Sequence, residues 1–264
     1  MGSVRAKSFV KFGILALILV AIDSTPTMAA SNRPPFPASS PGSLIDLSHW
    51  QLTIPGPITI APPALSTYSS KYFFYNARTG VGRLAAMAFV VDSRETGTTE
   101  NSQYVRSELR ETLVPNSTRT NWSVRDGTHT LSAMLRLNYG ASTPAQVTVL
   151  QIHGITPTGG NAPPLLRLAM MSGSLYAWIK RDGSNSDSNT DLLPLMSNIG
   201  SQPFSAQVVV QKGQLIIYVN GSTKVIRDVS FWPYDNYFKA GAYPQANSGT
   251  SEVDFFSLQV THAH

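Results

Sequence analysis

The sequence predicts an all-β fold, a sandwich or jelly roll of two antiparallel sheets. Short β-branched or alternating segments recur between Gly, Asn and Pro breaks, and no segment repeats apolar residues with the helical period. Only 13% of the 264 residues are charged, whereas the chain has 19 Gly and 18 Pro, a composition that disfavours helical bundles. Two breaks, Lys212-Gly213 and Asn220-Gly221, have the residues of tight hairpin turns. Helices should therefore be few and short.

Residues 1–30 have the pattern of a secretory signal peptide. Arg5, Lys7 and Lys11 precede an apolar run over residues 12–22, and the following Thr27-Met-Ala-Ala30 allows cleavage at Ala29 or Ala30. The run is short for a membrane span, although an uncleaved anchor is the alternative. The protein is therefore expected to be secreted or periplasmic, with no membrane attachment after cleavage.

The rest of the chain is predicted to be a Pro/Ser-rich linker, residues 31–43, followed by one domain over residues 44–264, acting as a monomer. The absence of cysteine excludes disulfides and thiol chemistry. A net charge of +5 suits a polyanionic partner, and export makes an acidic polysaccharide a better candidate than a nucleic acid.

Nine strands are predicted from alternation and β-branched content, with longer polar loops between some of them. The strands are residues 102–113, 128–137, 145–153, 165–171, 175–181, 207–211, 214–219, 237–243 and 253–261. The longer loops, at which lids or rims could lie, are residues 92–101, 154–164 and 183–201.

Three of these strands have a polar face. In residues 102–113 the face consists of Tyr104, Arg106, Glu108 and Arg110. A carboxylate between two arginines stays ionised and orients their guanidinium groups, although a solvated ladder of ion pairs has the same pattern. In residues 146–153, Gln151 and His153 share a face, where a neutral imidazole can be a general base or simply a structural residue.

The third polar face consists of Tyr237, Lys239, Gly241, Tyr243 and Gln245. The missing side chain of Gly241 is expected to leave room for a ligand between Lys239 and Tyr243. An amphipathic strand whose tyrosines cap the sandwich is the alternative, but three polar faces together favour a binding site.

These segments resemble the three signature blocks of the alginate lyases of polysaccharide lyase family seven. The blocks are Arg106-Ser-Glu-Leu-Arg110, Gln151-Ile-His153 and Tyr237-Phe-Lys-Ala-Gly-Ala-Tyr-Pro-Gln245, and Asp46-Leu-Ser-His-Trp-Gln-Leu-Thr-Ile-Pro55 resembles the family's opening strand. The resemblance runs from about residue 44 to residue 262, and Ala242 and Pro244 stand where the family varies. It implies a β-jelly roll whose concave sheet binds the polymer.

The resemblance also implies an activity, the cleavage of poly-mannuronate and poly-guluronate by β-elimination, which leaves unsaturated uronate ends. The C5 proton is weakly acidic because the C6 carboxylate is already negative, so Arg106 and Gln151 are suited to neutralise that carboxylate. By resemblance Tyr243 is the proton donor to the leaving oxygen. His153 either joins the neutralising groups or becomes the base for guluronate, whose departing groups lie on opposite sides of the ring, whereas Tyr243 can serve both roles on mannuronate.

The other predicted site residues bind substrate. They are Glu108, which positions the arginines, with Arg110, Tyr237, Lys239 and Gln245. No cofactor and no metal is expected, because the five histidines have no helical metal-ligand spacing, and His262 and His264 are interpreted as a frayed end.

Two other functions use the same fold. A glycoside hydrolase needs two carboxyl groups flanking the scissile bond, and the candidates are Glu108 with Glu111, on opposite faces, or Glu252 with Asp254. A non-catalytic lectin is possible on fold alone, but it has little use for His153 and Tyr243 together. The preference between mannuronate and guluronate stays open, as does internal against terminal cleavage.

Overall fold

The computed structural model describes residues 40–100, 102–112, 121–184, 186 and 188–263, and these residues form two antiparallel β-sheets with two 3-10 helices. The predicted signal peptide and residues 31–39 of the predicted linker lie outside the described residues. The end of that linker is packed. The 3-10 helix η1 (Pro41–Ser43) has buried residues, and the Ser40 hydroxyl donates to the Ser66 carbonyl at the end of η2 (Ala64–Ser66), at 3.3 Å.

Eight strands form the first sheet, sheet A. In spatial order they are β10 (Thr190–Met196), β9 (Ser174–Lys180), β8 (Asn161–Met171), β7 (Gln146–Ile155), β14 (Asp235–Pro244), β5 (Ser107–Glu111), β1 (Trp50–Ile54) and β2 (Ile58–Ile60). Seven strands form sheet B, in the order β13 (Ser222–Asp228), β12 (Gln214–Val219), β11 (Phe204–Gln211), β6 (Thr128–Leu137), β15 (Thr250–Ala263), β4 (Ala86–Asp92) and β3 (Phe73–Asn76).

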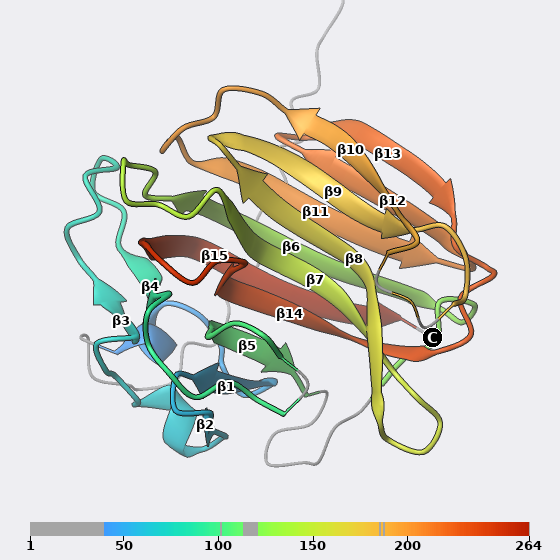
Figure 1. The fold of residues 1–264 in the computed structure, drawn as a ribbon, viewed down its shortest axis with the longest axis horizontal. Helices are drawn as coiled ribbons and strands as arrows, with labels where there is room; N and C mark the ends of the chain where they lie inside the picture. Colours follow the sequence, from blue (N-terminus) through green and yellow to red (C-terminus); the bar gives the residue numbers. More distant parts are fainter. Residues whose placement is uncertain (1–39, 101, 113–120, 185, 187, 264) are drawn as a thin grey trace, which may run out of the picture. The chain divides into compact units, whose positions relative to one another are not determined.

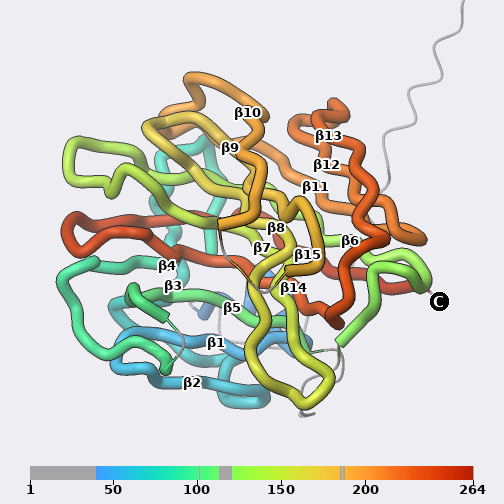
Figure 2. Tube along the Cα trace, turned by 45° about the vertical axis from the view of Figure 1, so that its right-hand side comes forward, coloured from blue at the N-terminus to red at the C-terminus, as the bar shows by residue number. Residues whose placement is uncertain are grey.

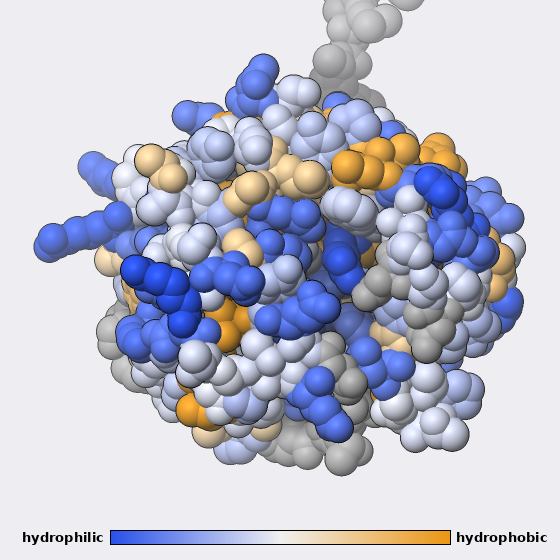
Figure 3. Space-filling view, viewed as in Figure 1, coloured by the Kyte–Doolittle hydropathy of each residue, from blue (hydrophilic) through white to orange (hydrophobic). Residues whose placement is uncertain are grey.

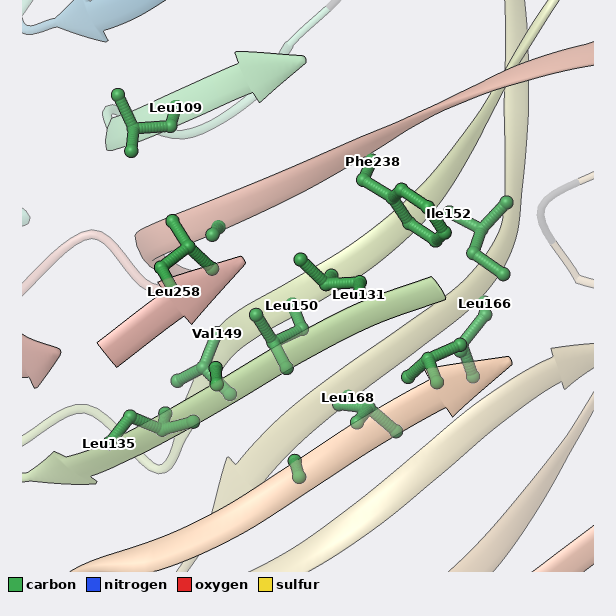
Figure 4. Packing of buried hydrophobic residues seen from close by; sticks show 14 of the residues in the cluster. Leu109, Leu131, Leu135, Val149, Leu150, Ile152, Leu166, Leu168, Phe238 and Leu258 are labelled. Atoms are coloured by element: carbon green, nitrogen blue, oxygen red, sulfur yellow. The ribbon is translucent and has the colours of Figure 1, made fainter. Parts of the chain in front are cut away.

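The two sheets pack face to face, as Figures 1 and 2 show, and enclose one hydrophobic core. Burial alternates at every residue of strand β6, and its buried side chains on the core face include Leu131, Ala133, Leu135 and Leu137. Figure 4 shows Leu131 and Leu135 of β6 among Leu150 and Ile152 of β7 and Phe238 of β14. The predicted all-β sandwich of antiparallel sheets is confirmed.

The two predicted hairpin turns are also confirmed. Lys212 and Gly213 join β11 to β12, Asn220 and Gly221 join β12 to β13, and all four residues have positive φ. Two consecutive positive φ values are what a two-residue type I′ turn requires.

Several predicted boundaries are wrong. The strand predicted over residues 102–113 is a strand only at β5, because β1 and β14 pair with residues 107–111 and neither reaches residues 102–106. Leu113 lies outside the described residues. The loop predicted over residues 154–164 is shorter, because β7 continues to Ile155 and β8 begins at Asn161.

The loop predicted over residues 183–201 contains the edge strand β10. Pro194 obscured this strand in the sequence, since proline weakens a strand pattern. It is tolerated here because an edge strand leaves the backbone on one side without a partner strand.

Candidate functional site

Two adjoining hollows of about 360 and 470 Å³ lie on sheet A and share Arg106, His153 and Asn161. We call them together the groove; Figure 3 shows hydrophilic side chains gathered around a hollow near the middle of this face. Eight of the nine sequence-predicted site residues line it: Arg106, Arg110, Gln151, His153, Tyr237, Lys239, Tyr243 and Gln245. The ninth, Glu108, lies beneath and bonds to three of them.

Strand pairing places the polar side chains in a row across the groove. Arg110 of β5 is directly opposite Lys239 of β14, which is opposite Gln151 of β7, which is opposite Arg167 of β8. Directly opposite residues share a face of the sheet, so three cationic side chains and one carboxamide are adjacent. Such a row suits a chain of carboxylates.

Glu108 holds three groove residues together. Its Oε2 accepts from Arg106 Nη1 at 3.2 Å and pairs with Lys239 Nζ, while its Oε1 accepts from Gln151 Nε2. Burial opposes ionisation of Glu108, but the charges of Lys239 and Arg106 hold its pKa below the usual range. Glu108 is 1% exposed, so the solvated ion-pair ladder is not what this face forms.

Lys239 has a pKa well below that of an ordinary lysine. Burial lowers its pKa to about 7; the Glu108 carboxylate opposes this shift, and the charges of Arg106 and Arg110 add to it. Near neutral pH this ammonium is therefore close to losing its proton.

His153 is a neutral imidazole with a defined tautomer. Burial, reinforced by the Lys239 charge, lowers the pKa of His153 well below 6.5. Its Nδ1 lies 3.0 Å from the Gly154 carbonyl oxygen and 3.1 Å from the Tyr237 hydroxyl. A carbonyl only accepts, whereas a hydroxyl can also accept, so a hydrogen on Nδ1 satisfies both contacts and leaves the lone pair on Nε2. The Tyr237 ring stacks on the imidazole, with 5.2 Å between ring centroids. The site therefore contains a base that is unprotonated at neutral pH.

Two tyrosines of β14 each hold an arginine against the ring. The guanidinium carbon of Arg106 lies 3.9 Å from the Tyr243 ring centre, and that of Arg110 lies 3.6 Å from the Tyr237 ring centre. Contacts of this kind stabilise by about 0.5–2 kcal/mol and fix the plane of the guanidinium group. The Tyr243 hydroxyl lies 3.0 Å from the Ser102 hydroxyl, so the loop before β5 contacts the phenol.

Gly241 does not have the expected role. A Cβ at this position would lie 2.4 Å from the Ser107 carbonyl oxygen and 2.6 Å from Glu108 Cα. The missing side chain thus makes room for the backbone of β5, not for a ligand. Its consequence for the site is indirect, because this close approach sets Glu108 beside β14.

Sequence reasoning missed several groove residues: Gln51, Thr53, Ser102, Asn161 and Arg167. Gln51 and Thr53 alternate with buried apolar residues in β1, and Arg167 is a lone charge in an apolar strand, so both signals were present in the sequence. Ser102 and Asn161 have no periodic signal, because Ser102 lies in a loop and Asn161 at the first position of β8.

His262 is not a frayed end. It lies in β15, where its Nδ1 is 2.7 Å from His129 Nδ1 and its Nε2 is 2.5 Å from Glu111 Oε1. Glu111 Oε2 also accepts from Trp122 Nε1. The frayed-end interpretation failed because alternation along one strand does not reveal which strand of the other sheet lies opposite. His264 lies outside the described residues.

Neither carboxylate pair of a hydrolase flanks the groove. Glu111 is fully buried with His262, on the side of β5 opposite Glu108, as alternation predicts. Asp254 of sheet B accepts from Arg136 at 2.8 Å and shares Asn76 with Glu252. Neither of these two pairs therefore supplies the paired carboxyl groups that glycoside hydrolysis needs in the groove.

Within the described part of the chain, no group of three His, Cys, Asp or Glu side chains could hold a metal ion. Over the same residues, no helix has the length and apolar character needed to cross a membrane.

Comparison with known proteins gives a consistent family. The alginate lyase family model matches residues 45–262. An alginate lyase of Photobacterium sp. (strain ATCC 43367) is 28% identical over 193 residues, which cover 60% of this chain and 66% of that protein, just under two thirds of its length.

Solved structures agree. Alginate lyase A1-II', a member of polysaccharide lyase family 7, superposes with a TM-score of 0.75 and 31% identity over 85% of this chain and 99% of that chain. A variant of that lyase in complex with substrate (GGMG) superposes with a TM-score of 0.74 and 32% identity, over 86% of this chain and 98% of that chain. An alginate lyase of Pseudomonas aeruginosa superposes with a TM-score of 0.69 and 31% identity, over 82% of this chain and 99% of that chain.

Proposed function

The chain belongs to the alginate lyase family, and from this premise we propose how the residues of its groove divide the reaction. It is a polysaccharide lyase that cleaves alginate, a polymer of mannuronate and guluronate, by β-elimination. One observation carries the proposal: Arg106, Gln151, His153 and Tyr243 all line the second hollow of the groove.

Carboxylate neutralisation is the first task. Arg106 and Gln151 donate to the C6 carboxylate of the reacting uronate, so that charge developing when C5 loses its proton is stabilised as it forms. Both side chains already bond to Glu108, which keeps them in place before substrate arrives. Glu108 is thus a positioning residue.

Proton transfer is the second task. Tyr243 protonates the glycosidic oxygen as the C4–O4 bond breaks. On guluronate, where the C5 proton and O4 lie on opposite sides, His153 takes the C5 proton at Nε2, and its neutral state at working pH supports this role. On mannuronate, where both lie on one side, Tyr243 as phenolate takes the C5 proton and returns it to the leaving oxygen.

Binding of neighbouring uronates is the third task. Arg110, Lys239 and Arg167 line the groove in the cross-strand row, and their charges suit carboxylates on adjacent sugars. Tyr237 holds the Arg110 guanidinium, and Gln245, which accepts from Thr148 at 2.9 Å, contacts the polymer near Tyr243.

A single substitution tests this assignment against a lectin that only binds the polymer. Tyr243→Phe removes one hydroxyl and keeps the ring that stacks on Arg106. We expect folding and polymer binding near normal and a loss of turnover of about 10²–10⁴-fold, followed as ultraviolet absorbance of the unsaturated product. If the folded variant retains most of its activity, Tyr243 is not the proton donor, and Tyr237 or Lys239 is the next candidate.

We also propose that the protein acts outside the cytoplasm as a monomer. The basic residues, apolar run and small residues of positions 1–30 support export. N-terminal sequencing of the exported protein, expected to begin near residue 30 or 31, and its mass in solution test both statements.

A further inference from the structure

The hydroxyl of Ser102 connects two groups to which the proposed function assigns different tasks. Arg106 Nη2 donates to Ser102 Oγ, and the same Oγ lies 3.0 Å from the Tyr243 hydroxyl. Its third contact is the Tyr104 carbonyl oxygen, at 3.3 Å. The Ser102 amide donates to the Thr99 carbonyl at 2.9 Å.

The inventory of donors limits what this hydroxyl can do. A serine hydroxyl has one hydrogen and accepts through two lone pairs, and a guanidinium group only donates. Arg106 therefore occupies one lone pair. The single hydrogen has two acceptors within reach, the Tyr104 carbonyl and the Tyr243 oxygen.

We propose that Ser102 is a positioning residue for proton transfer, whose hydroxyl turns from Tyr104 to Tyr243 as the tyrosine gives up its proton. While Tyr243 is a phenol it donates to Ser102 Oγ, and Ser102 donates to the Tyr104 carbonyl. When the Tyr243 proton passes to the glycosidic oxygen, Ser102 donates to the phenolate instead. No proton leaves Ser102, and the Tyr243 proton is restored from C5 on mannuronate or from solvent on guluronate.

Among the other charged or titratable groups near Tyr243, Arg106 also bonds to Ser102. Arg106 lies against the ring, and His153, Arg167 and Tyr104 line the same hollow. Lys239 and Glu108 lie next to Arg106. Ser102→Ala therefore removes the hydrogen bond to the phenol and one acceptor of Arg106, which keeps its bond to Glu108 and its stacking on the Tyr243 ring.

The inference rests on the proposed function of Tyr243, and the test separates the two. We expect Ser102→Ala to lower kcat by roughly 10- to 100-fold, because a hydrogen bond to a charged group is lost. The kcat–pH profile should also shift to higher pH, since the phenolate formed during proton transfer loses a donor. KM should change far less than kcat.

Two variants complete the experiment. Ser102→Thr keeps a hydroxyl and should restore both kcat and the pH profile, and Ser205→Ala, an exposed serine of β11 on sheet B, should match the wild type. An unshifted profile for Ser102→Ala, or an effect on KM alone, overturns the inference. So does Ser102→Thr failing as badly as Ser102→Ala. If Tyr243→Phe is inactive in the same assay, those results leave the proposed function intact; if Tyr243→Phe is active, the proposed function itself fails.

Discussion

Lys239, which lines the groove, forms an ion pair with Glu108 beneath it, and their side chains are only 9% and 1% exposed. The pair keeps a carboxylate inside a site that must attract carboxylates. Glu108 stays ionised, and the positive charges of Lys239 and Arg106 compensate its negative charge. The net charge that faces the polymer is therefore positive. This positive net charge is smaller when Lys239 loses its proton.

Substrate binding should therefore depend on pH near neutrality. Lys239 is protonated below its pKa of about 7 and loses its charge above it, so KM for alginate should rise as pH increases from about 6 to 8. Lys239→Met should lack this inflection. His153 does not contribute, because its pKa lies well below this range. Initial rates across this interval, in buffers of constant ionic strength, measure the effect, and a flat KM in the wild type contradicts it.

Gly241→Ala should unfold the protein more easily. The alanine Cβ would meet the backbone of Ser107 and Glu108, which cannot move aside as a flexible side chain can. We therefore expect the free energy of unfolding, measured by urea denaturation, to fall by about 2–4 kcal/mol. Gly80→Ala is the matched control, because Gly80 also has positive φ but nothing lies within 4 Å of its Cβ position. Equal losses in the two variants would show that backbone conformation alone sets the cost.

His153→Ala should distinguish the two uronates. Guluronate requires a base on the side opposite the leaving oxygen, so its cleavage should fall by about 10²–10⁴-fold and at least as far as mannuronate cleavage. Separate mannuronate and guluronate polymers, assayed at matched concentration, provide the comparison. A variant that loses mannuronate cleavage alone would mean that the base on guluronate is another residue.

Added salt should weaken binding more than chemistry. Arg110, Lys239 and Arg167 attract the polymer through charge, and at 0.1 M ionic strength such attraction is screened over about 10 Å. KM should rise with sodium chloride while kcat changes little. A KM indifferent to salt would indicate that hydroxyl contacts, rather than carboxylates, dominate binding.

Much of the site could be predicted because it lies on strands. Alternation in residues 237–245 identified which side chains of β14 line the groove, and Phe238, Ala240 and Ala242 are buried as that alternation requires. The same alternation predicts that Glu111 and Glu108 lie on opposite faces of their strand. This is confirmed, because Glu111 pairs with His262 and Glu108 pairs with Lys239. The family resemblance then joined three separate segments into one site.

Other features had no local signal. Ser102 reaches Tyr243 from a segment, residues 102–106, that pairs with neither β1 nor β14. His262 meets Glu111 only because β15 of sheet B packs against β5 of sheet A. The sequence shows that Gly241 lacks a side chain, but only the packing of β14 against β5 shows that the backbone of Ser107 and Glu108 occupies the space.

The sequence alone thus determined the all-β class, the hairpin turns at residues 212–213 and 220–221, and the shared face of Gln151 with His153 and of Tyr237 with Lys239 and Tyr243. These depend on backbone conformation and on the two-residue period of a strand, which are local. The tertiary structure decided the cross-strand row through Arg167, the buried Glu108–Lys239 pair and the contact of Ser102 with Tyr243. Those depend on strand order and register between residues up to 141 positions apart, which are set by the packing of the whole sandwich.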